Sequence, residues 1–495
     1  MASRAPAGPS ALEAHGRSGA LAASFRGHTI YPPLVCLLLV GVLLRAAVML
    51  FYSSAVFNYY NGDSGRYLRL GYTGLHGLFA DQAIPAGYPA LLQALRAISS
   101  NIAFVIGAQH VMGFVTGVLL YLAMRRAEAP RGVALIPAAV VLLSGDQVFL
   151  EHAVLTESPW TMLIAAGLYA AVRAYRPVSY RWLASAGALL ALAALVRHAA
   201  LLLPFLIAAW TSIAVSGRAR LRLCAALAVA LPALALLGAY VGVAKISGGY
   251  VGFTDRGGSQ LYGRVAQFAD CHKFAAPPVA RRLCDAVQPS RRHADPVHYL
   301  YDPDAPLQAI YHRRLSQSIL RRFAISAIEA QPFTYMRTVL HDYARYVDPG
   351  FGSTRRGAGA RPADMSFASR RPFASSRQAN TLPKIAASYR ERFGDVRSKP
   401  IDSAADVLGD YQSVMRVHGL LVPALVIITL LGLVLVRGLP RAVVALFFIC
   451  ALFLYAVPPA IAQYDVRYGV PAAELLAAAA ALAGWGVIRR LGPSA

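Results

Sequence analysis

Residues 30–52 read IYPPLVCLLLVGVLLRAAVMLFY, an apolar run that decides the fold class of the chain. About 20 such residues are enough to cross a bilayer as a helix. The run is too long for the apolar centre of a signal peptide and lacks a clear small-residue cleavage site, so we interpret it as a retained membrane helix. Residues 1–28, rich in Ala, Gly, Ser and Pro, are expected to form a disordered cytosolic tail.

Apolar runs of this kind recur along the whole chain. Of its 495 residues, 57% are hydrophobic and 15% are charged, and the mean hydropathy is +0.48. These values are typical of a polytopic membrane protein. We therefore predict an all-α polytopic membrane protein with about ten transmembrane helices. The predicted spans are 30–52, 102–124, 132–150, 155–174, 182–196, 199–217, 222–246, 417–436, 441–462 and 468–488.

The distribution of arginine predicts the orientation. With the N-terminus in the cytosol, the cytosolic tail and connections hold sixteen Arg, whereas the short loops on the opposite side hold five. Cytosolic loops carry such an excess, so both termini are expected in the cytosol. The same bias explains much of the net charge of +24, and because no basic helix or aromatic–basic module accompanies it, we predict no nucleic-acid binding. The high Ala and Arg content suggests a bacterial cytoplasmic membrane, with the opposite side in the periplasm.

The spans divide the chain into four parts. Residues 29–246 are predicted to form an N-terminal transmembrane catalytic module of seven spans, with a first external loop at 53–100. Residues 247–415 are expected to form a mainly helical extracytoplasmic domain, and 416–490 a C-terminal three-helix segment. Within the external domain, residues 350–383 are rich in Gly, Ser, Arg and Pro, which predicts a mobile loop.

The five cysteines fall into two groups. Cys36, Cys224 and Cys450 lie in apolar spans and are expected to be buried small hydrophobic residues. Cys271 and Cys284 are the two in the external domain, where an oxidising compartment favours a disulfide between them. A metal site there is not expected, because this cysteine pair with His272 and His293 nearby lacks recognised ligand spacing.

Polar residues gather beside the spans on the predicted outer side. Ionisable groups at such positions are functional candidates by default, because placing them there costs free energy. Four clusters share this side. They are Asp63, Arg66, Tyr67, His76 and Asp81; residues 144–157, with His152 and Glu157; Arg197 and His198, which either line a pocket or anchor at the interface; and residues 463–468, with Arg467 and Tyr468.

Three of these clusters resemble motifs of the GT-C membrane glycosyltransferases. An Asp in the first external loop, Asp63, precedes the Pro-x-Gly-Tyr-Pro segment at 85–89. An acidic residue, Glu157, stands in the second external loop, and an Asp-x-Arg-Tyr sequence at 465–468 opens the last span. The most similar branch comprises the protein O-mannosyltransferases, the aminoarabinose transferases and the Rgt-like enzymes, over roughly residues 30–250 and, more loosely, 417–488.

The resemblance implies an inverting transfer of a sugar from a polyprenyl-phosphate carrier to an extracytoplasmic hydroxyl group on a protein, glycolipid or polysaccharide. Asp63 would be the general base, since a hydroxyl nucleophile needs a carboxylate to take its proton. Arg467, with its forked and permanently charged donors, would hold the lipid phosphate. Four further residues are expected to contact the acceptor or the sugar: Glu157, His152, Tyr67 and Arg66. Four others are expected to contact the lipid phosphate: Tyr468, Lys245, Arg197 and His198.

The sequence departs from the branch beside Asp63: Ser64 stands where some members of the branch carry a second carboxylate. We expect no required cofactor, although a divalent ion shared by Asp63 and Glu157 stays open and is not favoured. A lipid-linked polysaccharide polymerase or ligase is an alternative, since the external domain offers Arg313, Arg314, Arg321, Arg322 and His341. A lipid or sugar transporter is a second alternative, although no symmetry between the two halves of the sequence supports it.

Overall fold

The structure is a computed structural model whose regular elements are all helices in the residues that it describes. The predicted tail at 1–28, most of segment 350–383 and the side chains of His76, Asp81, Arg313 and Arg314 lie outside that part of the chain. The described residues are 31–52, 63–71, 73–74, 77–79, 84–284, 291–312, 315–348, 365–367 and 402–491.

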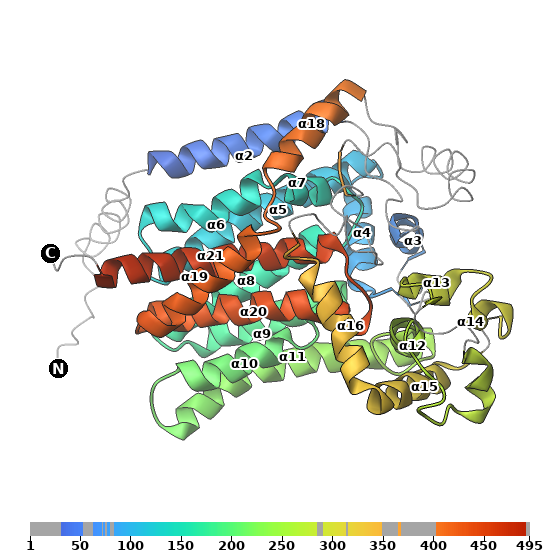
Figure 1. Ribbon diagram of the computed structural model, residues 1–495. Helices are drawn as coiled ribbons and strands as arrows, with labels where there is room; N and C mark the ends of the chain where they lie inside the picture. Colours follow the sequence, from blue (N-terminus) through green and yellow to red (C-terminus); the bar gives the residue numbers. More distant parts are fainter. Residues whose placement is uncertain are drawn as a thin grey trace, which may run out of the picture.

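Long apolar helices form the main body of the molecule (Figure 1). In the described part of the chain, five are long and apolar enough to cross a membrane, as expected of a helical membrane protein. They are α2 (Pro32–Phe51), α5 (Ile102–Arg126), α11 (Ala219–Gly248), α20 (Leu439–Ile461) and α21 (Val466–Leu491). The other helices of the bundle are α6 (Arg131–Leu143), α7 (Gly145–Glu151), α8 (Glu157–Tyr175), α9 (Tyr180–Val196), α10 (Leu203–Ala214) and α19 (Leu421–Leu435).

The segment predicted as one span at 132–150 is a bent pair. Helices α6 and α7 meet at 52° and count as a sixth span if the pair crosses the membrane as a unit. The break falls at Ser144, whose hydroxyl accepts a hydrogen bond from the Gln147 amide and so begins a new helix. Each of the ten predicted segments lies on a helix or on this pair, but the number of crossings stays a prediction.

Small residues allow the helices of the bundle to pack closely. A Cβ atom added at Gly187 of α9 would lie 1.9 Å from the Val229 carbonyl oxygen of α11. One added at Gly432 of α19 would lie 2.3 Å from the Ala483 side chain of α21. Glycine is thus required where these helix pairs meet, as is usual for helices that associate in membranes.

A buried polar network joins three helices inside the bundle. Glu151, at the end of α7, is fully buried and forms an ion pair of 2.7 Å with Arg45 of α2. Its second carboxylate oxygen lies 2.9 Å from His110 Nδ1, and His110 Nε2 lies 3.1 Å from His152 Nδ1. Gly113 leaves room for this carboxylate, since an added Cβ would lie 1.6 Å from Glu151 Oε1. The network ties α7 to α2 and α5.

The structure forms the predicted Cys271–Cys284 disulfide and corrects the burial of two other cysteines. Cys450 is buried, as expected, but Cys36 and Cys224 are exposed. Both lie on outward faces of α2 and α11, helices at the edge of the bundle. A small apolar residue there suits lipid as well as a protein core, so the sequence did not distinguish the two.

The disulfide belongs to a smaller helical body at one end of the bundle. Its own core gathers apolar side chains such as Tyr262, Phe268 and Phe323. Its helices are α12 (Gly257–Ala266), α13 (Pro296–Tyr301), α14 (Pro306–Ala309), α15 (Gln317–Ala330) and α16 (Pro332–Ala344). Its division from the rest of the chain at 247–415 stays a prediction.

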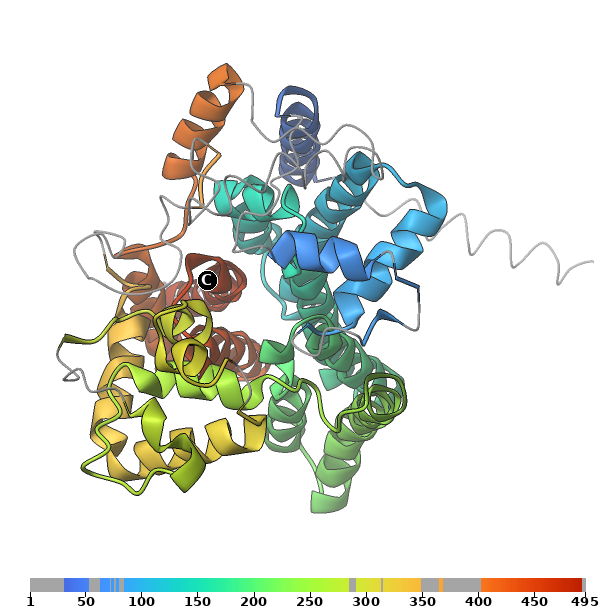
Figure 2. The ribbon, with the colours of Figure 1, turned by 90° about the vertical axis from the view of Figure 1, so that its right-hand side faces the viewer.

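Three shorter helices complete the same end of the molecule. They are α3 (Asp63–Leu70), α4 (Gly87–Ile98) and α18 (Asp402–Val414). Viewed toward this end, α3 lies across the bundle helices, many of which are seen nearly end-on (Figure 2). We call this end of the bundle the α3 end. Helices α2 and α21 begin and finish, respectively, at the opposite end (Figure 1).

Candidate active site

Arg467, the second residue of α21, touches three carboxylates at the α3 end. Its Nη2 lies 3.3 Å from Asp63 Oδ2, at the start of α3. Its Nε lies 3.6 Å from Glu157 Oε1, at the start of α8, and 3.6 Å from Asp465 Oδ2. One guanidinium thus joins three segments that are far apart in the sequence.

A second arginine shares the Glu157 carboxylate. Arg197, which follows α9, forms an ion pair with Glu157, whose side chain is only 1% exposed. Both guanidiniums also contact the Tyr468 ring, with Arg197 Cζ 4.1 Å and Arg467 Cζ 5.0 Å from its centroid. Two cations therefore lie on one aromatic ring, and the carboxylate between them offsets their repulsion.

The three carboxylates differ in their access to a ligand. The Asp63 side chain is 29% exposed, whereas those of Glu157 and Asp465 are 1% and 5% exposed. Asp63 is thus the acidic group of this cluster that a bound molecule can reach. The five side chains Asp63, Glu157, Asp465, Arg197 and Arg467 are called the ion-pair cluster below.

Local sequence explains why Arg467 points into the cluster. Helix α20 ends at Ile461, shortly after Pro458 and Pro459. Asp465 then caps α21, because its side chain accepts a hydrogen bond of 3.1 Å from the Arg467 amide. Aspartate is a preferred residue at this position, and the cap holds the arginine in the first turn of the helix.

Burial controls the charge of Asp465. Desolvation raises the pKa of this carboxyl from its usual 3.8 to about 6, against the opposing effect of the Arg467 guanidinium. The cluster therefore gains one negative charge when the Asp465 carboxyl loses its proton near pH 6.

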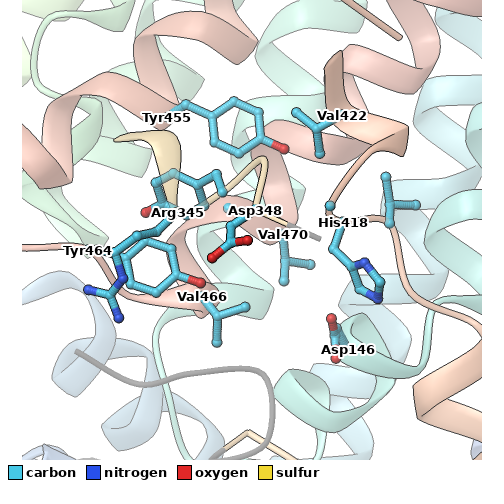
Figure 3. Close-up of a pocket in the computed structure, with 13 residues that line it drawn as sticks. Asp146, Arg345, Asp348, His418, Val422, Tyr455, Tyr464, Val466 and Val470 are labelled. Carbon is cyan, nitrogen blue, oxygen red and sulfur yellow. The ribbon is translucent and has the colours of Figure 1, made fainter. Parts of the chain in front are cut away.

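Alternate residues around the start of α21, from Tyr464 to Arg467, face opposite sides. Asp465 and Arg467 face the ion-pair cluster, whereas Tyr464 and Val466 line a recess that encloses about 390 Å³ between atoms, part of it open to solvent. Figure 3 shows Tyr464 and Arg345 along one side of this recess and His418 with Asp146 along the other. Its remaining lining residues are Tyr346, Asp348, Val417, Gly419, Val422, Tyr455, Gly469 and Val470.

The recess side also holds the segment in place. The Arg345 guanidinium lies 4.0 Å from the centroid of the Tyr464 ring. The Tyr346 hydroxyl donates a hydrogen bond of 3.1 Å to the Asp465 carbonyl oxygen. Both residues directly follow α16, so the end of this helix helps to fix the position of the Arg467 segment.

Tyr67 connects the cluster to the bundle. It lies one turn after Asp63 in α3, and its ring packs edge-on against Tyr88 at 5.0 Å. Tyr88 donates a hydrogen bond of 2.6 Å to Gln109 of α5. Desolvation, and next the Asp63 carboxylate, raises the pKa of the Tyr67 phenol, which keeps a donor hydroxyl beside Asp63.

Gly87 lets α4 approach α9, because an added Cβ would lie 2.5 Å from the Leu195 carbonyl oxygen.

Other residues predicted for the site lie elsewhere or apart from the ion pairs. His152 belongs to the buried network with His110 and Glu151. His198 packs against Phe253, with ring centroids 6.0 Å apart, and Lys245 is exposed in the last turn of α11. Arg66 is half-buried in α3. The roles predicted for these residues stay predictions.

The recess and the buried network were not predicted from the sequence. One signal for the network was the charge of Arg45 inside an otherwise apolar run, since such a residue needs a partner.

Within the described residues, no group of three or more His, Cys, Asp or Glu side chains is arranged to hold a metal ion. The carboxylates of Glu157 and Asp465 lie beside guanidiniums instead.

Three comparisons with known proteins bear on the chain. No family profile and no curated protein matches it. Among solved structures, it aligns with the archaeal oligosaccharyltransferase AglB from Archaeoglobus fulgidus, in complex with an inhibitory peptide and a dolichol-phosphate, at a TM-score of 0.42 and 13% identity. The alignment covers 93% of this chain and 52% of AglB, so the chain spans about half the length of that enzyme.

Proposed function

We propose that the protein is an inverting glycosyltransferase that moves a sugar from a polyprenyl-phosphate carrier to an acceptor hydroxyl group. The observation that carries the proposal is the contact between Asp63 and Arg467 at the end of a bundle of apolar helices. A base for the acceptor and a cation for the leaving phosphate are both required by this reaction, and they lie together where a lipid carrier can arrive.

Asp63 is the general base in this proposal. A carboxylate must lie within hydrogen-bond reach of the acceptor hydroxyl to take its proton as the oxygen attacks. Asp63 is the accessible carboxylate of the cluster, whereas Glu157 and Asp465 are almost fully buried. Tyr67 places a hydroxyl donor on the same helix, one turn away, where it can contact the acceptor or the sugar.

Arg467 and Arg197 stabilise the leaving phosphate. The bond between the sugar carbon and the phosphate oxygen breaks, and the electron pair stays on the phosphate, whose added charge needs fixed donors. Guanidinium groups supply charge and paired N–H donors together. Glu157 is a positioning residue in this scheme, because it holds both guanidiniums side by side. The arginines supply the cationic charge, so the proposal requires no divalent ion.

The direct contact of Asp63 with Arg467 has a mechanistic consequence. In an inverting displacement, the attacking oxygen and the leaving oxygen take opposite faces of the sugar carbon. The base and the cation must then have the sugar between them, yet here their side chains are 3.3 Å apart. Donor binding therefore has to separate Asp63 from Arg467, and the phosphate replaces the carboxylate as the partner of the guanidinium.

The proposal leaves the sugar and the acceptor class open, whether protein, glycolipid or polysaccharide. It places the site on the periplasmic side of a bacterial cytoplasmic membrane, in line with the arginine distribution. The test is transfer of labelled sugar from a polyprenyl-phosphate donor by purified protein in liposomes, with Asp63→Asn as the variant. Unchanged transfer by the variant would favour a polymerase or ligase reaction in the external domain. Transport of the lipid without transfer by the wild type would favour the transporter alternative.

A further inference from the structure

Helix α16 carries an apolar face that no described part of the protein covers. Phe333, Met336 and Leu340 are 89%, 52% and 57% exposed. At 100° per residue these three side chains lie within about 60° of one another on the helix surface. Their spacing thus makes one continuous apolar stripe, which we call the α16 stripe.

The opposite side of α16 faces the protein. Asp342 forms a buried ion pair of 2.6 Å with Arg264 of α12. The Tyr335 hydroxyl donates a hydrogen bond of 2.9 Å to the Ala460 carbonyl oxygen of α20. These two side chains lie about 180–200° from Phe333 around the helix, so the helix is amphipathic with its apolar stripe directed away from the protein.

The position of α16 identifies what the stripe meets. This helix lies across the bundle helices (Figure 1), and the view toward the α3 end places it at the periphery of the molecule (Figure 2). Its contact with Ala460 places it at the level where α20 ends, since that helix finishes at Ile461. The apolar surface of the bundle continues beside it, because Ile461 is 50% exposed. Where α20 crosses a bilayer, a helix beside its end lies near the boundary between hydrocarbon and headgroups.

We infer that α16 is an interfacial helix that inserts Phe333, Met336 and Leu340 into the leaflet at the α3 end. Amphipathic helices of this kind lie in the plane of the membrane with their apolar face among the outer acyl carbons. Arg337 and His341 flank the stripe and are both exposed, where they can contact lipid phosphates. A cationic flank beside an apolar stripe suits a lipid surface better than an aqueous one.

Helix α16 connects to the candidate active site through the chain. Arg345 and Tyr346, which hold the segment carrying Arg467, directly follow α16. Docking of the helix on the leaflet therefore sets the height of that segment relative to the headgroups. The lipid contact itself does not depend on whether the protein transfers a sugar.

Site-directed spin labelling in liposomes tests the inference. Cys36, Cys224 and Cys450 are replaced by alanine, the disulfide is left intact, and single labels are placed at 333, 336 and 340, with Glu329→Cys as the exposed charged control on α15. Power saturation compares collisions with oxygen, which concentrates in lipid, and with a water-soluble nickel chelate. Neither measurement requires enzymatic activity.

The expected result is high oxygen access and low nickel access at all three stripe positions, with the reverse at 329. Nickel access equal to that of the control at the stripe would show a helix in water and overturn the inference. Protection from both reagents would also overturn it, since it would mean that protein, such as a second copy of the chain, covers the stripe. Replacing Phe333 by a labelled cysteine does not disturb folding contacts, because that side chain is 89% exposed.

Discussion

Asp63 and Arg467 stand 404 positions apart in the sequence, and their side chains meet at 3.3 Å. The pair joins the first residue of α3 to the first turn of α21. Asp63, the base proposed for the acceptor hydroxyl, is thus paired with Arg467, the cation proposed to bind the donor phosphate. A glycosyl donor has to replace one partner with the other, which makes the pair the feature on which the proposed mechanism depends.

Replacing Arg467 by lysine should weaken transfer while the charge stays. Lysine keeps the cation but loses the forked N–H donors that meet phosphate and carboxylate together. Losing one charge-assisted hydrogen bond corresponds to a decrease of about tenfold or more in the transfer rate. The matched control is Arg489→Lys, an exposed residue at the opposite end of α21. Equal activity of the two variants would remove Arg467 from the site.

Glu157→Gln should destabilise the protein as well as inactivate it. The change leaves the buried Arg467 guanidinium and the partly buried Arg197 guanidinium beside one ring without their shared carboxylate. Removing one member of a buried ion pair lowers the free energy of unfolding by about 3–5 kcal/mol. Thermal unfolding in detergent should show a clear decrease in Tm, with the exposed Glu329→Gln as control. An unchanged Tm would mean that Glu157 does not hold the two arginines together.

Asp465→Asn should change the pH dependence of stability. The folded state raises the pKa of Asp465 from 3.8 to about 6, so the folded protein keeps a proton that the unfolded chain releases in this range. Wild-type stability therefore has a contribution that is lost as pH rises from about 4 to about 6. Asparagine also caps helices and does not titrate.

The Tm of Asp465→Asn minus the Tm of the wild type should thus increase as pH rises from about 4 to about 6, and then level off. The variant should also bind an anionic lipid phosphate more tightly at pH 7, since it removes one negative charge from the cluster. A Tm difference that is constant from pH 4 to pH 7 would contradict the assignment of this titration to Asp465.

Gly113→Ala should disrupt the buried network around Glu151. A Cβ at 113 would lie 1.6 Å from Glu151 Oε1, whereas one at Gly107 of the same helix meets nothing within 4 Å. Gly107→Ala is the matched control and should raise Tm slightly, because alanine favours helices by about 1 kcal/mol relative to glycine. Gly113→Ala should lower Tm. Equal effects of the two variants would mean that Glu151 does not occupy the space beside Gly113.

Much of the ion-pair cluster can be predicted from the sequence, because its members stand beside apolar runs on the predicted outer side of the membrane. Asp63, Glu157 and Arg467 follow this rule, and the structure brings them together. The sequence predicts Arg197 as a contact of the lipid phosphate. Its ion pair with Glu157 cannot be predicted in this way, because ion-pair partners between helices depend on how the helices pack. The partners of Arg45, the bend at Ser144 and the stripe on α16 likewise depend on which faces of the helices meet.

The most direct test of the proposed mechanism measures sugar transfer and donor binding together in the Asp63→Asn variant. Without the carboxylate, the transfer rate should fall by about 10²-fold or more, the usual contribution of a general base. Donor affinity should rise or stay equal, because the phosphate no longer competes with Asp63 for Arg467. The exposed Asp406→Asn variant should change neither quantity. Unchanged transfer, or loss of donor binding in Asp63→Asn, would contradict the account.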